Sequence, residues 1–358
     1  MSSSATSNSS NICVITNVDS LTGYALAYHI LEKIRNRQDT AANRRVRVLT
    51  RSRDSQLNLD VLKEMNAEVM EIDYNDENRV REAVRDARNV ILIPEQSRNR
   101  VREAENVIKA AKHTDVDHFV LVSITGVDCL EQRAQFGHYP NLSEYYRIEE
   151  RVKESFQGKK HCIIRHSVFN QLFYFMGPQI ENDNKLSLPI EKSDKWCAVD
   201  LNDFCEGMWR LARKHQEGSD ISSKKTFNFC ADHARSTEDH VRDMGKGLNR
   251  DELRFNSISE NEMRQYLKQM REDEHFRERP KHSRDESNSR RERDTFSTLP
   301  LGRFLNDQCI ETMEEFWKSA SEGYQNLKCD DLKDVLEREP QNLKHFFKNN
   351  RENFKRLK

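Results

Sequence analysis

The strongest constraint on the fold is a regular alternation of short apolar runs with helical patterns in the first half of this 358-residue chain. Apolar runs predict strands, and segments with apolar residues three or four positions apart predict helices between them. The predicted strands are 12–16, 46–51, 67–73, 89–94, 117–125 and 159–167. Because these runs are apolar on both faces, the pattern predicts an α/β fold with a doubly wound parallel sheet, covered by helices on both sides.

The sequence pattern changes from Asn170 onward. Helical patterns dominate there, and only 226–230 and 252–257 are predicted to be extended. This change predicts a smaller, mostly helical lobe beside the sheet domain. Ligands of doubly wound sheets bind outside the carboxyl ends of the strands, so we expect the lobe to pack over that edge. The predicted organisation is a disordered tail at 1–11, the sheet domain at 12–169 and the helical lobe at 170–358.

One segment, 271–294, departs from both patterns. It has eight basic and eight acidic residues, and Phe276 is its only large apolar residue. Such a segment cannot bury enough surface to offset the entropy cost of ordering it, so it predicts a disordered insert. The alternative is a partner-binding or phosphorylatable tract, since Ser283, Ser287 and Ser289 lie among arginines.

Charge and cysteine usage exclude several classes of function. The net charge is −1, from 59 basic and 60 acidic residues, which gives no electrostatic argument for nucleic-acid binding. No apolar run approaches the roughly 18 residues that a membrane span requires. The eight cysteines are scattered without a C-x-x-C pair, so neither a zinc site nor a dithiol redox site is predicted. Cysteines within apolar runs indicate reduced, buried thiols, as expected in the cytoplasm or nucleus.

The turn after the first predicted strand reads T-N-V-D-S-L-T-G, from Thr16 to Gly23. A dinucleotide-binding turn uses three glycines: for the sharp turn, for close approach of the backbone to the pyrophosphate, and for packing of the helix on the strand. The turn resembles the T-G-A-T-G-x-x-G opening of the NmrA-like family, a group of atypical short-chain dehydrogenases. In this alignment Asn17 replaces the first glycine, Ser20 replaces the second, and Gly23 keeps the third.

The resemblance extends over almost the whole chain. The matching stretches are VLTRSRDS (48–55), AEVMEIDYND (67–76), VDHFVLVSITGVD (116–128), YRIEERVKES (146–155), KWCAVDLNDFCEGM (195–208) and DVLEREPQNLKHFFKNNRENF (334–354). Membership of the NmrA-like family implies that 12–169 is a Rossmann domain that binds NAD or NADP. Some members reduce small molecules or quinones, whereas others are redox-sensing regulators without chemistry, including repressors of transcription.

The residues of the proton relay favour the regulators. Short-chain dehydrogenases use a tyrosine as acid and base, with a lysine four residues later. In the alignment Tyr145 stands at the lysine position, and no catalytic residue is predicted. If Tyr145 or Tyr146 is taken as the catalytic tyrosine instead, Glu149 or Glu150 takes the place of the lysine, and a carboxylate raises the pKa of a phenol.

The sequence therefore predicts a non-catalytic regulator, a pseudoenzyme, that binds NAD(P) weakly and a protein partner, for which the family suggests a transcription factor. The alternative is an NADPH-dependent oxidoreductase acting on a small carbonyl or quinone.

The residues at the turn leave cofactor binding open. Asn17 is a mild replacement because asparagine tolerates left-handed backbone angles. Ser20 adds a hydroxymethyl group where the backbone approaches phosphate, and Asp19 adds a negative charge, although Asp19 could instead cap the helix. Arg51, after the second strand, is a candidate clasp for the 2′-phosphate of NADP, with a solvated basic turn as the alternative.

The other candidate residues end strands at the same edge of the sheet. The resemblance implies that Asp73 and Tyr74 flank the adenine, with a helix cap as the alternative role. No metal ligand is predicted. The complete set of predicted cofactor-binding residues is Thr16, Asn17, Ser20, Leu21, Thr22, Gly23, Arg51, Asp73, Tyr74, Ile93, Pro94, Ser123 and Tyr145.

Overall fold

The computed structural model describes residues 11–36, 44–52, 59–114, 116–132, 135–158, 161–217, 224–277 and 300–358. The chain forms two compact units. The first comprises Met1–Glu95, Asn99–Val122 and Ile148–Ile163, and the second comprises Gln96–Arg98, Ser123–Arg147 and Ile164–Lys358. The chain passes between the units several times, so they do not follow a single boundary at residue 169.

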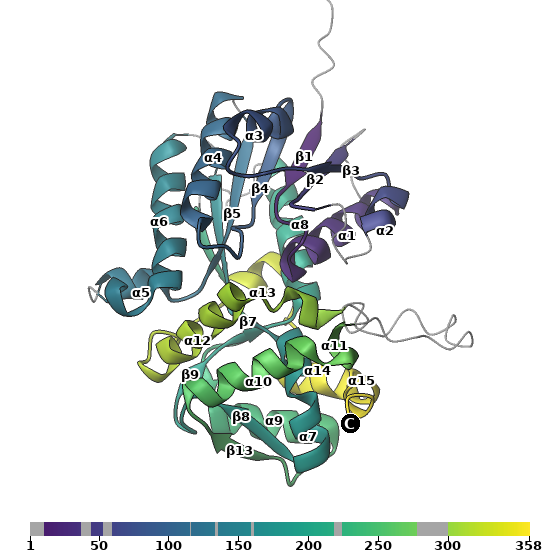
Figure 1. Ribbon diagram of the computed structural model, residues 1–358, viewed down its shortest axis with the longest axis vertical. Helices are drawn as coiled ribbons and strands as arrows, with labels where there is room; N and C mark the ends of the chain where they lie inside the picture. The colour runs from purple at the N-terminus through teal and green to yellow at the C-terminus, as the bar shows by residue number, and fades with distance from the viewer. Residues whose placement is uncertain are drawn as a thin grey trace, which may run out of the picture. The chain divides into compact units, whose positions relative to one another are not determined.

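A seven-stranded sheet organises the fold (Figure 1). Its strands are β1 (Ile12–Ile15), β2 (Arg45–Thr50), β3 (Glu68–Glu71), β4 (Ala87–Leu92), β5 (His118–Ile124), β6 (His161–His166) and β11 (Thr226–Phe229). The spatial order is β11-β6-β5-β4-β1-β2-β3, and the pairs from β3 to β5 run parallel. The predicted doubly wound α/β fold is therefore confirmed. The strand order reverses between β1 and β4, which is the point where such sheets bind ligands.

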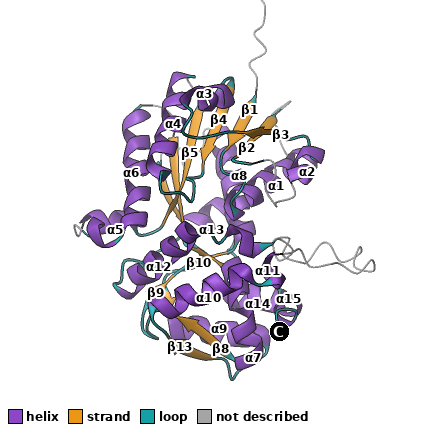
Figure 2. Ribbon diagram, in the orientation of Figure 1, coloured by secondary structure: helices purple, strands orange, loops and turns teal. Residues whose placement is uncertain are grey.

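Helices lie on both sides of this sheet, as the apolar strands require (Figure 2). They are α1 (Leu21–Arg35), α2 (Leu59–Glu64), α3 (Glu77–Val84), α4 (Arg100–His113) and α6 (Pro140–Ser155), whereas α5 (Val127–Gln132) belongs to the second unit. A buried core joins α3, α4 and the second half of α6 to the strands; Val80, Val107 and Phe156 are among its members. Among the described helices none combines the length and apolarity needed to cross a membrane.

The seventh strand, β11, was predicted only as a short extended piece of the helical lobe. In the structure it forms the edge of the main sheet next to β6. Its pattern is Thr-Phe-Asn-Phe, and Phe227 and Phe229 are buried whereas Thr226 and Asn228 are partly exposed. This alternation is typical of a strand with one covered face. Its membership of the sheet depends on a partner far away in sequence, which the local pattern does not reveal.

The remaining elements belong to the second unit. They are η1 (Phe136–His138), β7 (Val168–Phe169), η2 (Asn170–Met176), α7 (Gly177–Asp183), β8 (Lys185–Leu188), β9 (Lys195–Trp196), β10 (Ala198–Val199), α8 (Leu201–Glu217), β12 (Arg235–Ser236), α9 (Thr237–Leu248), β13 (Arg254–Ser257), α10 (Glu260–Glu272), α11 (Glu274–Arg277), η6 (Leu301–Phe304), α12 (Asp307–Ser321), α13 (Asp331–Leu336), α14 (Leu343–Asn349) and α15 (Arg351–Lys355). Helices predominate, and the short strands form three two-stranded pairs, β10-β7, β12-β9 and β13-β8.

The start of the charged segment is ordered, which the sequence prediction missed. Residues 271–277 form the end of α10 and the short helix α11. Phe276 is buried and packs against Phe175, with ring centroids 5.3 Å apart. Together with the Arg271–Asp307 ion pair at 2.7 Å, this contact holds the stretch within the second unit. The rest of the predicted insert, 278–294, and the tail at 1–10 lie outside the described residues.

Close packing fixes the start of α1 on the end of β1. A Cβ atom added to Gly23 would lie 2.0 Å from the backbone oxygen of Asn17, much closer than any two such atoms can approach. Backbone atoms cannot move aside as a flexible side chain can. The third glycine of the turn is therefore required by packing, as predicted for this position.

We expect Gly23→Ala to destabilise the protein by about 3 kcal/mol or more, because the turn must shift to admit the methyl group. Gly137→Ala is the matched control, since a Cβ there would meet no atom within 4 Å. Urea unfolding of the two variants and the parent protein measures the difference. Equal stabilities of the two variants would show that the turn yields easily.

Candidate functional site

The turn between β1 and α1 adopts the dinucleotide-binding shape without its first two glycines. Asn17 has φ 51°, in the left-handed region that the first glycine usually supplies. Its amide N–H donates to the Tyr74 hydroxyl at 2.8 Å, and its side-chain Nδ2 donates to the Pro94 carbonyl at 3.1 Å. The prediction that asparagine tolerates this position is confirmed, and the side chain adds a tie to the end of β4 that glycine could not make.

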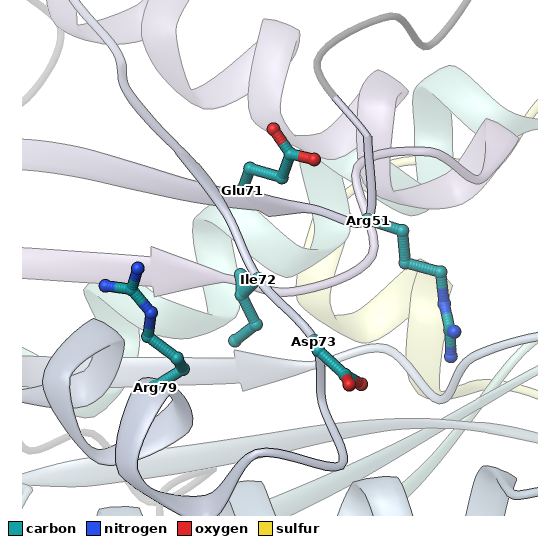
Figure 3. Close-up of a pocket in the computed structure, with 5 residues that line it drawn as sticks. All are labelled: Arg51, Glu71, Ile72, Asp73 and Arg79. Carbon is teal, nitrogen blue, oxygen red and sulfur yellow. The ribbon is translucent and has the colours of Figure 1, made fainter.

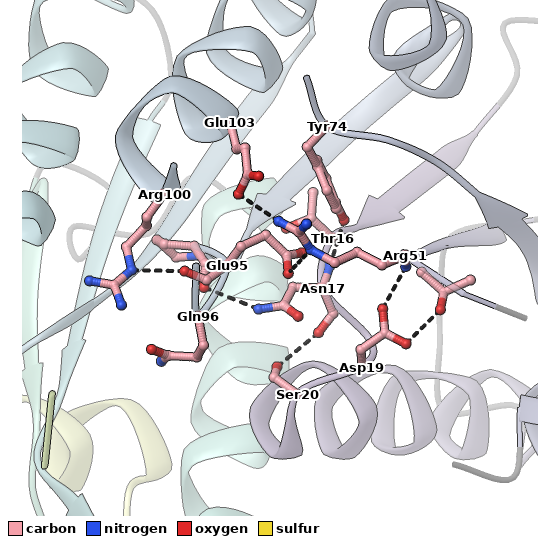
Figure 4. Close-up of polar contacts among 12 residues, drawn as sticks. Thr16, Asn17, Asp19, Ser20, Arg51, Tyr74, Glu95, Gln96, Arg100 and Glu103 are labelled. Carbon is pink, nitrogen blue, oxygen red and sulfur yellow. Dashed lines mark hydrogen bonds and ion pairs between the residues drawn. The ribbon is translucent and has the colours of Figure 1, made fainter. Parts of the chain in front are cut away.

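Ser20 caps α1. Its hydroxyl accepts from the Gly23 amide at 3.0 Å and donates to the Asn17 carbonyl at 2.8 Å (Figure 4). The next two amides, of Leu21 and Thr22, make no hydrogen bond within the described part of the chain. First-turn amides of this kind attract anions, because they add to the positive end of the helix dipole. The turn thus keeps two donors for a phosphate group.

Asp19 does not cap the helix, contrary to the alternative raised from the sequence. Its two carboxylate oxygens accept from the Thr50 hydroxyl and from the Arg51 amide, both at 2.6 Å. Both donors lie at the end of β2, so Asp19 links the turn to the neighbouring strand. The link also places a negative charge beside the helix start, where a pyrophosphate would have to bind.

The guanidinium of Arg51 is paired with two carboxylates, although its side chain remains partly exposed. Its guanidinium pairs with Glu95 at 2.9 Å and with Glu103 at 2.6 Å, and it lies over the Tyr74 ring at 5.6 Å (Figure 4). The Glu95 and Glu103 side chains are only 7% and 2% exposed, whereas that of Arg51 is 39% exposed. Two buried carboxylates therefore hold the one cation that was predicted to bind the 2′-phosphate.

The pKa of Glu95 is raised in this cluster. Burial raises the pKa of Glu95 most, Arg51 lowers it, and the nearby Asp19 and Glu103 carboxylates raise it, which together bring it to about 7. Its Oε1 atom is buried without a hydrogen-bond partner among the described residues. One arginine cannot neutralise two buried carboxylates, so Glu95 takes up a proton as the pH falls below about 7. Arg100 holds the neighbouring backbone, because its Nε donates to the Glu95 carbonyl at 2.8 Å.

A pocket of about 500 Å³ opens beside the cluster, at the ends of β2 and β3 (Figure 3). Its lining has two arginines and two carboxylates and only one aliphatic side chain. The lining residues are Arg51, Glu71, Ile72, Asp73 and Arg79. The pocket lies where a Rossmann fold holds the adenosine of its cofactor. The mixed charge of its walls gives no strong preference for a phosphate.

The two residues predicted to flank the adenine differ in exposure. Asp73 lines the pocket, and hydrogen bonds from the backbone and side chain of Asn75 lower its pKa. Tyr74 is only 1% exposed, and its hydroxyl serves the turn by accepting from Asn17. Tyr74 is therefore part of the support of the turn and has no face left for an adenine. Neither residue caps α3, because Asp76 does so.

The structure brings most of the predicted residues together. Thr16 exchanges hydrogen bonds with the Ile93 backbone at 2.9 and 3.1 Å, and the bonds of Asn17 join the turn to Tyr74 and Pro94. The predicted cofactor-binding residues that lie in the first unit are Thr16, Asn17, Ser20, Leu21, Thr22, Gly23, Arg51, Asp73, Tyr74, Ile93 and Pro94. Sequence reasoning missed Glu95 and Glu103. The only signal for them was an acidic residue directly after a strand and another on the helix that follows.

The other two predicted residues, Ser123 and Tyr145, belong to the second unit. Ser123 is fully buried, and its hydroxyl has no partner within the described residues. The Tyr145 hydroxyl accepts from Gln96 Nε2 at 3.1 Å, so a neutral amide contacts this phenol. Four residues further along α6 stands Glu149, which is fully buried. The proton relay of a short-chain dehydrogenase is therefore missing its lysine here.

We expect the stability gained by Glu95→Gln to grow as the pH rises from 4.5 to 8. Between its ordinary pKa and about 7, the folded protein binds a proton on Glu95 that the unfolded chain has lost. Rising pH therefore destabilises the parent protein through this group, whereas glutamine resembles the neutral acid at every pH. The difference in free energy of unfolding between Glu95→Gln and the parent protein, measured by urea unfolding, should change by roughly 1–3 kcal/mol over this pH range. A difference that does not change with pH would show that Glu95 stays ionised.

Solved structures share this fold at low sequence identity. The NADPH-dependent quinone oxidoreductase of Escherichia coli, complexed with NADPH, matches with a TM-score of 0.66 and 15% identity over 94% of this chain and 98% of its own. The triphenylmethane reductase of Citrobacter sp., complexed with NADP(H), matches with a TM-score of 0.65 and 12% identity over 95% and 99%. A nucleoside-diphosphate-sugar epimerase of Staphylococcus aureus matches with a TM-score of 0.63 and 15% identity over 94% and 99%.

A search of curated proteins finds no significant match to the sequence. The family comparison is positive and covers most of the chain, from the middle of α1 to the end of α12. It agrees with the family resemblance seen in the sequence, although the turn at Asn17 to Gly23 lies just before the matched residues. Residues 26–321 match the NmrA-like family, and the chain belongs to it.

Proposed function

We propose that this chain is a non-catalytic NmrA-like protein that binds NAD(H) or NADP(H) weakly and couples that binding to a protein partner. The observation that carries the proposal is the pairing of Arg51 with Glu95 and Glu103. This pairing occupies the cation that would recognise the cofactor. It also leaves an excess of negative charge where the phosphates would lie.

The turn itself supports dinucleotide binding. The left-handed Asn17 and the close packing at Gly23 reproduce the backbone path of a phosphate-binding turn. The amides of Leu21 and Thr22 would donate to the pyrophosphate, and Asp73 in the pocket wall could accept from a ribose hydroxyl. These groups would hold the cofactor in position, and its nicotinamide would supply hydride chemistry in an active relative.

The charges oppose tight binding. Glu95 and Glu103 pair with the Arg51 guanidinium, and Asp19 accepts from the Arg51 backbone amide, so three carboxylates surround one cation. A 2′-phosphate would have to compete with two buried carboxylates for Arg51, and the pyrophosphate would meet Asp19. We therefore expect weak affinity without the preference for NADP that Arg51 suggests in the sequence. Affinity should rise as the pH falls below about 7, because Glu95 then becomes neutral.

The residues of the relay support a role without chemistry. A phenol acts as an acid and base near neutral pH only when a neighbouring cation lowers its pKa. Tyr145 instead contacts the neutral amide of Gln96, and the fourth residue after it is the buried Glu149. A dinucleotide-binding protein without this relay can report cofactor binding only through another molecule. We propose that this molecule is a protein, as for the regulators of the family.

The competing function is an NADPH-dependent oxidoreductase acting on a small carbonyl or quinone. Arg51 and Arg79 both line the pocket, and a modest rearrangement of Arg51 would give it two cations. Two of the similar structures are described as an NADPH-dependent quinone oxidoreductase and a triphenylmethane reductase. Binding and turnover measurements separate the two functions.

Calorimetric titration of the parent protein should show weak binding of all four nicotinamide dinucleotides, with NADP(H) no tighter than NAD(H). Glu95→Gln and Glu103→Gln each remove one of the two carboxylates that pair with the Arg51 guanidinium. Each should tighten NADP(H) binding selectively, by about tenfold, which corresponds to about 1.4 kcal/mol. Glu105→Gln is the control, since it removes the same charge from α4 but Glu105 pairs with Arg151.

Two results of this titration contradict the proposal. Tight and selective binding of NADP(H) by the parent protein would mean that breaking the ion pairs of Arg51 with Glu95 and Glu103 requires little free energy. Equal effects of Glu95→Gln and Glu105→Gln would mean that only the net charge matters. If no dinucleotide binds to any of these variants, the turn has lost its ligand and the chain acts through protein contacts alone.

Turnover provides the second test. We expect no oxidation of NADH or NADPH above the uncatalysed rate with a panel of quinones and aldehydes, because the relay has no lysine. Absorbance at the nicotinamide band measures the rate directly. Turnover at ordinary enzyme rates, about 1 per second or faster, would establish the oxidoreductase instead.

A further inference from the structure

Three cysteines that are distant in sequence meet in the second unit. The Sγ atoms of Cys197, Cys230 and Cys329 all lie within 4.8 Å of one another. All three residues are buried, with 2%, 2% and 6% exposure, and all three are free thiols. The spacing of the cysteines in the sequence gave no indication of this cluster, because no C-x-x-C pair occurs. Neither the proposed dinucleotide site nor the pocket beside it uses these residues.

The three thiols come from three different segments. Cys197 lies between β9 and β10, Cys230 directly follows β11, and Cys329 lies in the stretch before α13. Backbone hydrogen bonds hold the segments together: Ala231 donates to Ala198 at 2.8 Å, and Ala234 donates to Leu327 at 2.9 Å. The cluster is therefore fixed by the fold rather than by the flexible side chains themselves.

Neighbouring groups make the cluster a closed site. Ala234 and Leu327 pack against the three buried cysteines. His233 is oriented by the same segments, because its Nδ1 accepts from the Cys329 amide at 3.1 Å. Three soft sulfur donors shielded from water are the donor set that thiophilic metal ions select. Structural metal sites are closed in this way, whereas catalytic sites keep a position open to substrate.

We propose that Cys197, Cys230 and Cys329 bind one thiophilic d¹⁰ metal ion, Zn²⁺ or Cu⁺, in a structural site. Zinc bound by thiolates at ~2.3 Å places its sulfurs about 3.8 Å apart, so the observed cluster needs only small side-chain adjustments. Three thiolates suit Cu⁺ without a further ligand, whereas Zn²⁺ would take a fourth. Either ion would join the end of β11 to the segments before β10 and α13.

The test uses the full chain, reduced and freed of metal with a chelator. Zn²⁺ in one arm and Cu⁺ under anaerobic conditions in the other are titrated against a competing chelator, and elemental analysis gives the stoichiometry. We expect one ion per chain and a higher thermal unfolding temperature in the arm of the cognate metal. Cys329→Ala and Cys230→Ala should weaken binding at least about 100-fold, more than the loss of an outer-shell partner does.

Cys205→Ala is the matched control, because Cys205 is equally buried in the same unit but is not one of the three clustered thiols. It should bind metal like the parent protein. Circular dichroism checks that each variant folds. The parent protein loaded with Co²⁺ gives a second readout that needs no variant, the thiolate-to-cobalt charge-transfer absorption.

Two outcomes overturn the proposal. The first is that the parent protein binds both ions no more tightly than Cys329→Ala does, and that the cobalt-loaded parent protein shows no charge-transfer absorption. The second is metal binding that Cys205→Ala reduces as strongly as Cys329→Ala does. A disulfide between two of the three cysteines, formed by mild oxidation of a protein that binds no metal, would identify a redox pair instead.

Discussion

The approach of α1 to the end of β1 sets the geometry on which the rest of the first unit depends. Because Gly23 has no Cβ, the helix can begin directly against the Asn17 carbonyl. The left-handed Asn17 then turns its amide toward Tyr74 and its side chain toward Pro94. These bonds tie β1, β3 and β4 together at the point where the strand order reverses. A phosphate-binding turn can thus persist with one glycine, provided that its other two positions find partners.

In the cluster at Arg51, the cation expected at the cofactor site is paired with carboxylates of the chain itself. Without Arg51, the two buried carboxylates would carry a large desolvation penalty. An ion pair of Arg51 with only one of them would have no net charge. The observed set is negatively charged, and the elevated pKa of Glu95 relieves that charge by binding a proton. Under the proposed function, the same proton would couple the stability of the first unit to its affinity for anions.

Much of the fold followed from the sequence, since each predicted strand of the first half is a strand of the sheet. The role of Gly23 and the left-handed Asn17 could also be predicted, because backbone geometry at a turn is a local property. Glu95 and Glu103 could not, because the burial of a carboxylate depends on a partner from a distant segment. The same reason explains why β11 and the three-cysteine cluster escaped prediction: each is defined by neighbours that only the folded chain supplies.

The position of β11 at the sheet edge also bears on biosynthesis. Until Thr226–Phe229 leaves the ribosome, β6 would be the outermost strand on its side of the sheet, with a row of unpaired backbone N–H and C=O groups. Nascent chains that stop before this point would expose the edge of β6, and that side of the sheet would be completed only by a strand encoded much later. Proteolytic fragments or truncated messages ending upstream of residue 226 should accordingly be substrates for chaperones rather than independent domains.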